Sequence, residues 1–421
     1  MSPTKIVIIG QGYVGLPLAK EACAAGLSVV GLDLNRKTVD ALNAGRSHVD
    51  DLSDQDIATM LTQGYRATAD ASAIAEADVV IICVPTPLNA DGSSPDLGPV
   101  EGAMKSIAAH LKKGALVVLE STTYPGTTDT LVKGILDERG LRIDEDYFLA
   151  FSPERIDPGN PTFGLRNTPK IVGGVSSESG RRAAEFYSSL VDTVVQARGA
   201  REAETAKLLE NTYRHVNIAL VNEMARFCHE LGIDIWDVID AAKTKPFGFQ
   251  AFYPGPGVGG HCIPIDPNYL SYEVKRSLGY PFRFVELAQE INSSMPRYTV
   301  DRIQALLNDE SKAVKGSSVL LLGVTYKADI ADQRESPAIP VAEELRNRGA
   351  DVRFHDPKIA EWRLPSGSLE RVADLEQALA TSDIVVLLQK HSEYDLARLS
   401  DKSAVFFDTR GATRTSSARR L

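Results

Sequence analysis

A short glycine motif near the amino terminus restricts the fold of this chain more than any other feature. An apolar run at residues 5–9 leads directly into the motif, and residues 16–25 after it have a helical pattern. The motif itself reads Gly10-Gln11-Gly12-Tyr13-Val14-Gly15. Strand, glycine turn and helix in this order predict a dinucleotide-binding unit, because the glycines let the backbone approach a pyrophosphate at the helix N-terminus.

The residues that follow indicate which dinucleotide binds. A second apolar run, residues 28–32, ends at Asp33, which suits a hydrogen bond to a ribose hydroxyl. A 2′-phosphate would meet this carboxylate, so we expect the cofactor to be NAD rather than NADP. Arg36 lies close enough to keep NADP as an alternative.

Alternating strand and helix patterns predict an α/β fold with a doubly wound parallel sheet. Apolar runs at 79–84, 116–120 and 148–151 are separated by helical patterns at 100–111 and 127–139. Ligands bind at the carboxyl ends of such strands, so the turns there should line the cofactor crevice. These turns contain Val84, Pro85, Thr86, Ser121, Thr122, Glu154 and Arg155. Ordinary turn chemistry is the alternative for each one taken singly.

Two long helices are predicted after residue 200. Residues 202–231 have apolar positions at helical spacing, namely Ala206, Leu209, Tyr213, Val216, Leu220, Met224 and Phe227. One other side presents Lys207, Asn211, Arg214 and Asn217, for which surface solvation is the alternative to function. Residues 284–307 predict a second helix, broken near Pro296.

A second, smaller α/β unit is predicted in the last third of the chain. Strands at 318–322, 351–354, 384–388 and 404–407 with a helix at 338–348 form its parallel sheet. It lacks a full glycine fingerprint, so we assign it no second dinucleotide. The polar and basic tail, residues 413–421, is expected to be disordered. The predicted domains are therefore 1–198, 199–310 and 311–421.

The second glycine-rich stretch, residues 253–267, holds a lone thiol. Four glycines and two prolines precede Cys262, and Asp266 follows four residues later. A thiol presented from such a loop is placed like a nucleophile, whereas a structural turn with a buried cysteine is the alternative. No second ligand at suitable spacing accompanies His261, so no metal site is predicted.

Composition and charge exclude several classes of protein. A chain of 421 residues is expected to form two or three domains. Its net charge of -10 argues against nucleic acid and anionic membrane surfaces as partners. We find neither a secretory signal nor an apolar run of transmembrane length. Four scattered cysteines suit a reducing compartment, so we expect a cytoplasmic protein, with Cys23, Cys83 and Cys228 in the core.

Together these motifs resemble the UDP-glucose/GDP-mannose dehydrogenase family over essentially the whole chain. The resemblance is carried by residues 10–17, 84–87, 121–122, 153–154, 259–266, 326–327 and 334–337, with Lys207 and Asn211. It implies two Rossmann-like domains joined by a helical segment that forms a homodimer. Residues 151–160 and 260–264 look like the branch that oxidises UDP-N-acetylhexosamines.

The implied reaction converts the C6 hydroxyl of UDP-N-acetyl-D-glucosamine to a carboxylate with two NAD, for surface polysaccharide synthesis. UDP-N-acetyl-D-mannosamine is the alternative substrate. A one-step alcohol dehydrogenase would need no thiol. A non-catalytic sensor of NAD or nucleotide sugar is disfavoured because thiol, lysine and carboxylates are all present.

The resemblance also implies roles for individual residues. Cys262 would add to the aldehyde and form the thioester, while Lys207 and Asn211 would stabilise charge at C6. Asp266 would position water or take up a proton, Glu154 would be the base for thioester hydrolysis, and Thr122 would hold water and contact the cofactor. The further implied contacts are Arg155, Arg214, Asn217, Tyr253, Gly255, Gly257, Gly259 and Lys327 for the substrate and Arg334 for the cofactor.

Overall fold

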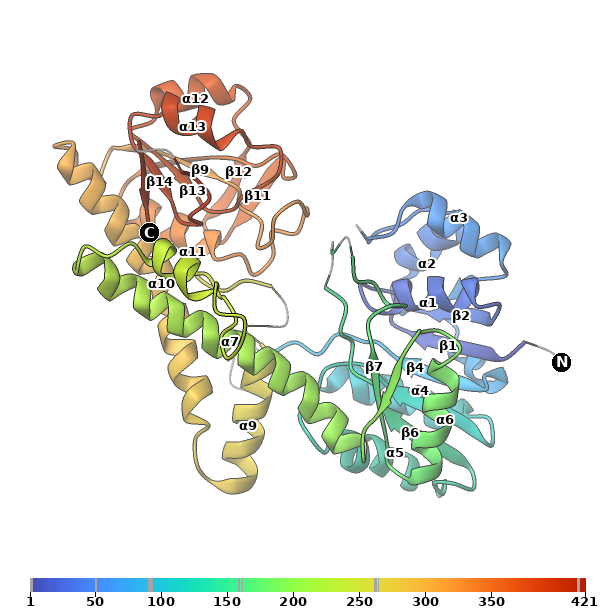
Figure 1. Ribbon diagram of the computed structural model, residues 1–421. Helices are drawn as coiled ribbons and strands as arrows, with labels where there is room; N and C mark the ends of the chain where they lie inside the picture. The colour runs from blue at the N-terminus through green and yellow to red at the C-terminus, as the bar shows by residue number, and fades with distance from the viewer. Residues whose placement is uncertain are drawn as a thin grey trace. The chain divides into compact units, whose positions relative to one another are not determined.

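The computed structural model describes residues 3–49, 51–89, 94–157, 160, 162–260, 263, 265–414 and 417–421 (Figure 1). The chain divides into two compact units. The first contains residues 1–210 and 268–280, and the second contains residues 211–267 and 281–421. Within the described residues, we find no helix with the length and apolar content that crossing a bilayer requires.

The first unit is built on an eight-stranded sheet in the order β3-β2-β1-β4-β5-β6-β7-β8. The strands are β1 (Lys5–Ile9), β2 (Ser28–Leu32), β3 (Arg66–Thr68), β4 (Val79–Ile82), β5 (Ala115–Leu119), β6 (Tyr147–Phe151), β7 (Lys170–Gly174) and β8 (Val194–Gln196). All pairs are parallel except β6 with β7, which are antiparallel. The predicted doubly wound parallel sheet is thus confirmed, with one reversed junction.

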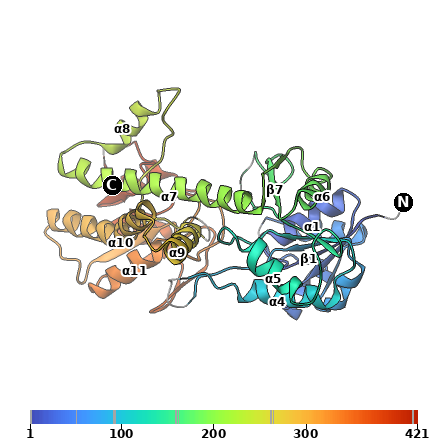
Figure 2. The same cartoon turned by 90° about the horizontal axis from the view of Figure 1, so that it is seen from below.

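Helices cover both faces of this sheet (Figure 2). They are α1 (Gly15–Ala24), α2 (Arg36–Asn43), α3 (Asp54–Thr62), α4 (Gly98–His110), α5 (Lys133–Asp137) and α6 (Ser177–Tyr187), with short turns η1 (Ala71–Glu76) and η2 (Thr128–Val132). Successive strand residues enter opposite core clusters, because side chains alternate along a strand. Ile6 and Ile8 join one cluster, and Val7 and Ile9 the other.

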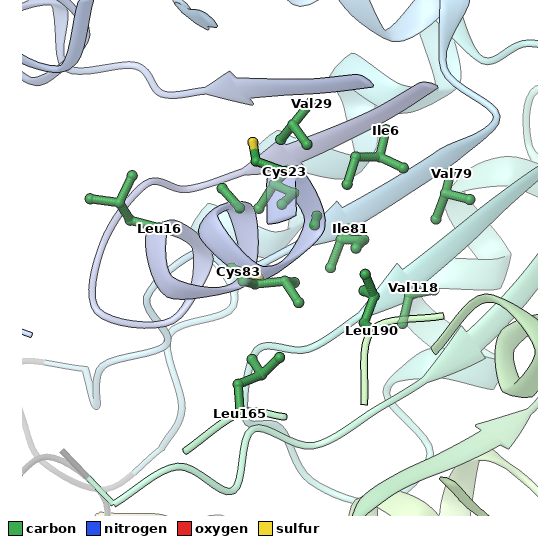
Figure 3. Close-up of a cluster of buried hydrophobic side chains, with 14 of the residues drawn as sticks. Ile6, Leu16, Cys23, Val29, Val79, Ile81, Cys83, Val118, Leu165 and Leu190 are labelled. Atoms are coloured by element: carbon green, nitrogen blue, oxygen red, sulfur yellow. The ribbon is translucent and has the colours of Figure 1, made fainter. Parts of the chain in front are cut away.

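Figure 3 shows part of the first cluster. Ile6, Ile81 and Val118 come from neighbouring strands, and Leu16 and Cys23 come from α1. All five side chains are at most 3% exposed. The predicted core placement of the cysteines is confirmed, since Cys23, Cys83 and Cys228 are all buried.

The second unit contains a five-stranded parallel sheet in the order β10-β9-β13-β14-β15. Its strands are β9 (Ser318–Leu322), β10 (Asp351–His355), β13 (Ile384–Leu387), β14 (Phe406–Asp408) and β15 (Ala418–Arg420), beside a hairpin of β11 (Glu361–Leu364) and β12 (Gly367–Glu370). Its helices are α8 (Ile235–Ala242), α10 (Arg283–Asp309), α11 (Ala338–Asn347), α12 (Leu375–Thr381) and α13 (Leu396–Lys402). Two further helices, α7 (Ala200–Glu230) and α9 (Asp266–Leu278), contribute residues to both units.

Two sequence predictions for the second unit are wrong. The tail predicted to be disordered forms β15, and Leu421 behind it is only 5% exposed. Pairing with β14 provides hydrogen-bond partners for the backbone of β15. Arg420 also forms an ion pair with Asp234. The helix predicted to break near Pro296 is continuous as α10. Buried apolar residues on both sides of this proline outweigh the hydrogen bond that it cannot donate.

Candidate active site

The first glycine motif lies where the order of the strands reverses, between β1 and β4. Gly10 has φ +91°, and a side chain there would come within 2.5 Å of the Cys83 carbonyl oxygen. Gly15 packs so closely that its Cβ would lie 1.9 Å from the Gly10 carbonyl oxygen. At Gly12, however, a Cβ would meet no atom within 4 Å. The first and third glycines are therefore required by packing, and the second leaves the turn open to a ligand.

The start of α1 fits the pyrophosphate of NAD. No side chain caps this helix at Val14, so its first N–H groups can donate to an anion. Tyr13 is 37% exposed beside the open turn. These residues would hold the dinucleotide. A bound NAD would supply a nicotinamide ring that accepts a hydride.

The Asp33 carboxylate is fixed at the end of β2. Its Oδ2 accepts a hydrogen bond from the Gln11 backbone N–H at 2.9 Å, and its Oδ1 accepts one from Asn35 N–H at 2.8 Å. The Gln11 side chain is fully buried, where its Oε1 accepts from the Tyr65 hydroxyl at 2.7 Å. Gln11 therefore supports the turn from within. Arg36 is exposed as the first residue of α2.

We predict that Asp33→Ala lowers the affinity for NAD by about 10- to 100-fold, the scale of a lost hydrogen bond to a charged group. The ratio of kcat/KM for NAD to that for NADP should fall, because no carboxylate then opposes a 2′-phosphate. Initial rates with both cofactors test this, with the exposed Asp40→Ala as the control. An unchanged ratio would remove Asp33 from cofactor selection.

Hydrogen bonds join the carboxyl ends of β4 and β5. Ser121 Oγ donates to the Val84 carbonyl oxygen at 2.7 Å, and Thr86 Oγ1 donates to the Thr122 carbonyl oxygen at 2.8 Å. The structure thus brings these four predicted residues together, with Pro85 between them in sequence. Tyr269 of α9 also donates to the Thr86 carbonyl. Neither Tyr269 nor the helix that contains it was predicted from the sequence.

Glu204 of α7 fixes the loop that follows Thr122. Its Oε2 accepts from Gly126 N–H at 2.6 Å, and its Oε1 accepts from Thr128 N–H at 2.9 Å and Thr128 Oγ1 at 2.7 Å. The side chain is buried, and burial raises the pKa of Glu204 to about 7, against the effect of these donors.

This raised pKa predicts a pH-dependent contribution to stability. An unfolded Glu has a pKa of about 4.3, so between about pH 4 and pH 7 the folded state binds more protons and stability falls as pH rises. Relative to Glu204→Gln, the wild type should lose on the order of 3 kcal/mol across this window. Unfolding midpoints of both proteins at pH 5 and pH 8 test this, with exposed Glu202→Gln as the control. A difference between wild type and Glu204→Gln that is independent of pH would contradict it.

Helix α7 buries much of its polar side and exposes much of its apolar side. Lys207 is 6% exposed and Asn211 is 9% exposed, whereas Leu209 is 64% exposed. The other exposed apolar residues of the helix are Tyr213, Leu220 and Phe227. Exposure to solvent therefore does not explain why Lys207 and Asn211 are polar. Within the described chain the Lys207 ammonium has no hydrogen-bond or ion-pair partner, so it suits an anionic group of a ligand.

Asn211 and Asp266 form a buried polar pair in the second unit. Asn211 Nδ2 donates to Asp266 Oδ2 at 2.6 Å, and Asp266 is 2% exposed at the start of α9. Lys207 precedes Asn211 by one helical turn, so both share one side of α7. The predicted nucleophile Cys262 lies outside the described residues, as do His261 and Pro264.

The turn after β6 is fixed to α7 in the first unit. Arg155 Nη2 lies 2.7 Å from Glu210 Oε1, and Arg155 Nη1 donates to the Pro169 carbonyl oxygen at 2.6 Å. Neighbouring Glu154 is nearly buried, with a side chain 10% exposed. Its Oε1 accepts from the Ile156 N–H. Arg155 therefore already has protein partners, so any contact with the substrate would need to share them.

Four other residues predicted to bind the substrate or the cofactor lie at separate places on the chain. Arg214 is exposed, and Asn217 Nδ2 donates to the Tyr213 carbonyl oxygen of its own helix at 2.7 Å. Arg334 donates to both carboxylate oxygens of Asp332, at 2.9 and 2.8 Å. Lys327 lies in the turn after β9, where its carbonyl oxygen accepts from Thr325 Oγ1.

The glycines of the second motif are explained by packing within the second unit. A Cβ at Gly255 would lie 2.9 Å from Arg410 Nη1, one at Gly257 would lie 2.9 Å from Pro337 Cβ, and one at Gly259 would lie 2.8 Å from the Glu335 carbonyl oxygen. These approaches support the predicted close backbone contact, although here the neighbour is protein. Tyr253 is half-exposed and stacks on Trp236 at a centroid distance of 6.3 Å.

A buried chain of amides supports this glycine loop. Gly255 N–H donates to Asn222 Oδ1 at 3.0 Å, Asn222 Nδ2 donates to Asn292 Oδ1 at 2.9 Å, and Asn292 Nδ2 donates to the His215 carbonyl oxygen at 3.2 Å. Burial lowers the pKa of His215 to about 4, so its imidazole is neutral at pH 7. His215, Asn292 and Gly257 border a hollow of about 450 Å³.

Comparison with known proteins assigns all three parts of the chain to one family. Residues 4–191 match the NAD binding domain of the UDP-glucose/GDP-mannose dehydrogenase family, residues 201–294 its central domain and residues 320–415 its UDP binding domain. A UDP-N-acetyl-D-mannosamine dehydrogenase of Methanocaldococcus jannaschii is 35% identical over 93% of this chain and 86% of that protein.

Two solved structures agree with the fold. The UDP-D-ManNAc dehydrogenase of Pyrococcus horikoshii superposes with a TM-score of 0.90 at 31% identity, covering 99% of each chain. The NDP-N-acetyl-D-galactosaminuronic acid dehydrogenase of Methanosarcina mazei gives 0.85 at the same identity, covering 100% of this chain and 95% of that one. These two solved structures, which are named for different sugars, have the same sequence identity to this chain.

Proposed function

This chain belongs to the UDP-glucose/GDP-mannose dehydrogenase family of NAD-dependent nucleotide-sugar 6-dehydrogenases, and from this premise we propose that it oxidises UDP-N-acetyl-D-glucosamine to the corresponding uronate. The observation that supports oxidation at C6 is the burial of polar groups on one side of α7. These groups are Lys207 and the hydrogen-bonded pair of Asn211 and Asp266. The motif at residues 151–160 supports the N-acetylhexosamine.

UDP-N-acetyl-D-mannosamine is the second candidate substrate. The names of the relatives from M. jannaschii and P. horikoshii favour it. The two sugars differ only in configuration at C2, so a few contacts to the acetamido group decide between them.

The proposed chemistry needs two hydride transfers to two successive NAD molecules. After the first, the Cys262 thiolate adds to the aldehyde carbon, so that the second hydride can leave and a thioester remains. Water then attacks the thioester carbonyl, and the C–S bond breaks. Lys207 stabilises the oxyanion at each stage, Asn211 and Asp266 hold the hydroxyl or water, Glu154 takes the water proton, and Thr122 orients water near the cofactor.

Product stoichiometry tests both the reaction and the sugar. The purified protein and NAD would be mixed in turn with UDP-GlcNAc, UDP-ManNAc, UDP-GalNAc and UDP-glucose, and NADH would be counted per sugar consumed. Two NADH from UDP-GlcNAc, with little turnover of the others, is the expected result. Preference for UDP-ManNAc would keep the mechanism and change the substrate, whereas one NADH per sugar would overturn the thioester route.

We predict that Arg214→Ala raises KM for the nucleotide sugar by about 10-fold or more, as expected when a hydrogen bond from a charged group is lost. KM for NAD should change little, because the proposed contact is with the acetamido sugar. The control is Arg297→Ala, an exposed arginine on α10. Equal increases in both KM values would remove Arg214 from the sugar site.

The same proposal includes the domain roles and the assembly. Residues 1–198 would bind NAD, 199–310 would carry the thiol loop and form the dimer, and 311–421 would bind the UDP part through Lys327 and the loop containing Tyr253, Gly255, Gly257 and Gly259. The exposed apolar side of α7 supports a homodimer, since such stripes mark interfaces. We propose that the enzyme works in the cytoplasm, where cysteine thiols stay reduced.

A further inference from the structure

A buried charge cluster lies beside Glu154 in the first unit. Glu120 follows β5, Lys170 begins β7 and Tyr187 ends α6, and their side chains are almost completely buried. Lys170 Nζ lies 3.1 Å from Glu120 Oε2 and 3.8 Å from Glu154 Oε2. The Tyr187 hydroxyl donates to Oε1 of Glu120. Lys170 Nζ lies over the Tyr187 ring, 5.3 Å from the ring centroid.

The cluster holds two carboxyl groups against one ammonium. With both carboxyls ionised, the buried cluster has two negative charges and one positive charge, so each carboxylate acts on the charge of the other. Burial raises the pKa of Glu120, and the charge of Glu154 adds to the rise while Lys170 opposes it. Burial opposes the charge on Lys170, but the two carboxylates outweigh it and raise its pKa. Lys170 is therefore a permanent cation.

The two oxygens of Glu154 differ in their surroundings. Oε1 accepts the Ile156 N–H, whereas Oε2 is buried and receives no hydrogen bond from the described residues. Lys170 is the cation that faces Oε2. The remaining titratable groups of this cluster are Tyr187 and the buried thiol of Cys83, and burial raises the pKa of both well above its usual value. Neither therefore carries a charge at neutral pH.

We propose that Lys170 and Glu120 are positioning residues for the hydrolytic step: Lys170 holds the Glu154 carboxylate in the orientation of the base, and Glu120 with Tyr187 fixes Lys170. This inference rests on the proposed role of Glu154. In the step, the Glu154 carboxylate takes a proton from the attacking water, the new C–O bond forms and the Cys262 thiolate leaves as the C–S bond breaks. The proton is then released to solvent.

A buried ion pair can also serve packing alone, so the test must separate orientation from stability. The two neighbours act on Glu154 with opposite sign, because Lys170 is an opposite charge and Glu120 is a like charge. Substituting each should therefore move the pH dependence of hydrolysis in opposite directions. A purely structural role would lower the rate without moving the profile.

The experiment measures thioester hydrolysis in single turnovers of the full-length enzyme across pH, with quenched samples analysed for acyl-enzyme and acid. In Glu120→Gln, which preserves the shape beside Tyr187, the pH of half-maximal rate should fall by about one unit; in Lys170→Met it should rise by at least about one unit. Lys170→Arg should restore most of the wild-type profile. The control is Lys113→Met, which removes an exposed ion pair with Asp146.

Each outcome has a separate meaning. Opposite shifts in the two variants support the inference, and an unmoved profile in Glu120→Gln overturns it even if Lys170→Met does not fold. The role of Glu154 is tested by Glu154→Gln alone. If that variant hydrolyses the thioester at the wild-type rate, the proposed base is wrong; if it is slow while the profiles of the other two do not move, only the present inference fails.

Discussion

Replacing Cys262 with serine should stop the reaction before any acid is formed. An aldehyde carbon has no neighbouring alkoxide to expel a second hydride, and the thiolate supplies one by adding to that carbon. A serine hydroxyl is not ionised near neutral pH and adds poorly. We expect acid formation to fall by at least about a thousandfold, the scale seen when a covalent nucleophile is removed.

Quenched time courses with product analysis measure this loss directly. Wild type should give two NADH and one acid per sugar, whereas Cys262→Ser should give no acid and no acyl-enzyme. Cys228→Ala is the control, because it removes a different, buried thiol, which lies on α7. Full uronate production by Cys262→Ser would refute the thioester route.

The elements most accurately predicted from sequence are the buried parallel strands. The runs that became β1, β5 and β9 are almost wholly apolar, and only burial on both faces of a sheet explains such runs. The glycine turn at residues 10–15 was equally predictable. Gly10 and Gly15 leave no room for a Cβ, and Gly12 keeps the turn open for the approach of a ligand.

The errors have a common physical cause, which is that local polarity does not report tertiary partners. The tail at residues 413–421 is basic, yet backbone pairing with β14 orders its last strand. The predicted apolar face of α7 is largely exposed, since the helix buries Lys207 and Asn211 instead. A site that uses a buried cation must bury a polar side of the helix. Sequence periodicity alone does not show which side that is.

The charge cluster beside Glu154 shows the same limit. Lys170 stands at the start of an apolar strand, where a lysine is ordinarily a surface residue at the sheet edge. Its partners Glu120 and Tyr187 are 50 and 17 positions away in sequence, so spacing gives no indication of their contact. Only the three-dimensional arrangement identifies it as an ion-pair centre.

Substitution of Lys207 by alanine should lower kcat by about 10²- to 10³-fold, the usual effect of removing one group that stabilises an oxyanion. The charge at C6 appears as the hydroxyl loses its proton, again in the thiol adduct and again during hydrolysis. Lys207 is 6% exposed, so water can replace its ammonium only poorly. KM for NAD should remain near the wild-type value.

Two further variants make this prediction specific to a buried ammonium. Lys207→Arg keeps the charge, but its planar, larger guanidinium does not fit the site of a point-like ammonium, so we expect only partial recovery of kcat. Lys105→Ala, on the exposed side of α4, should leave kcat unchanged. If Lys207→Ala instead raised KM for the sugar at constant kcat, Lys207 would bind ground state and transition state equally, and the oxyanion would need another cation.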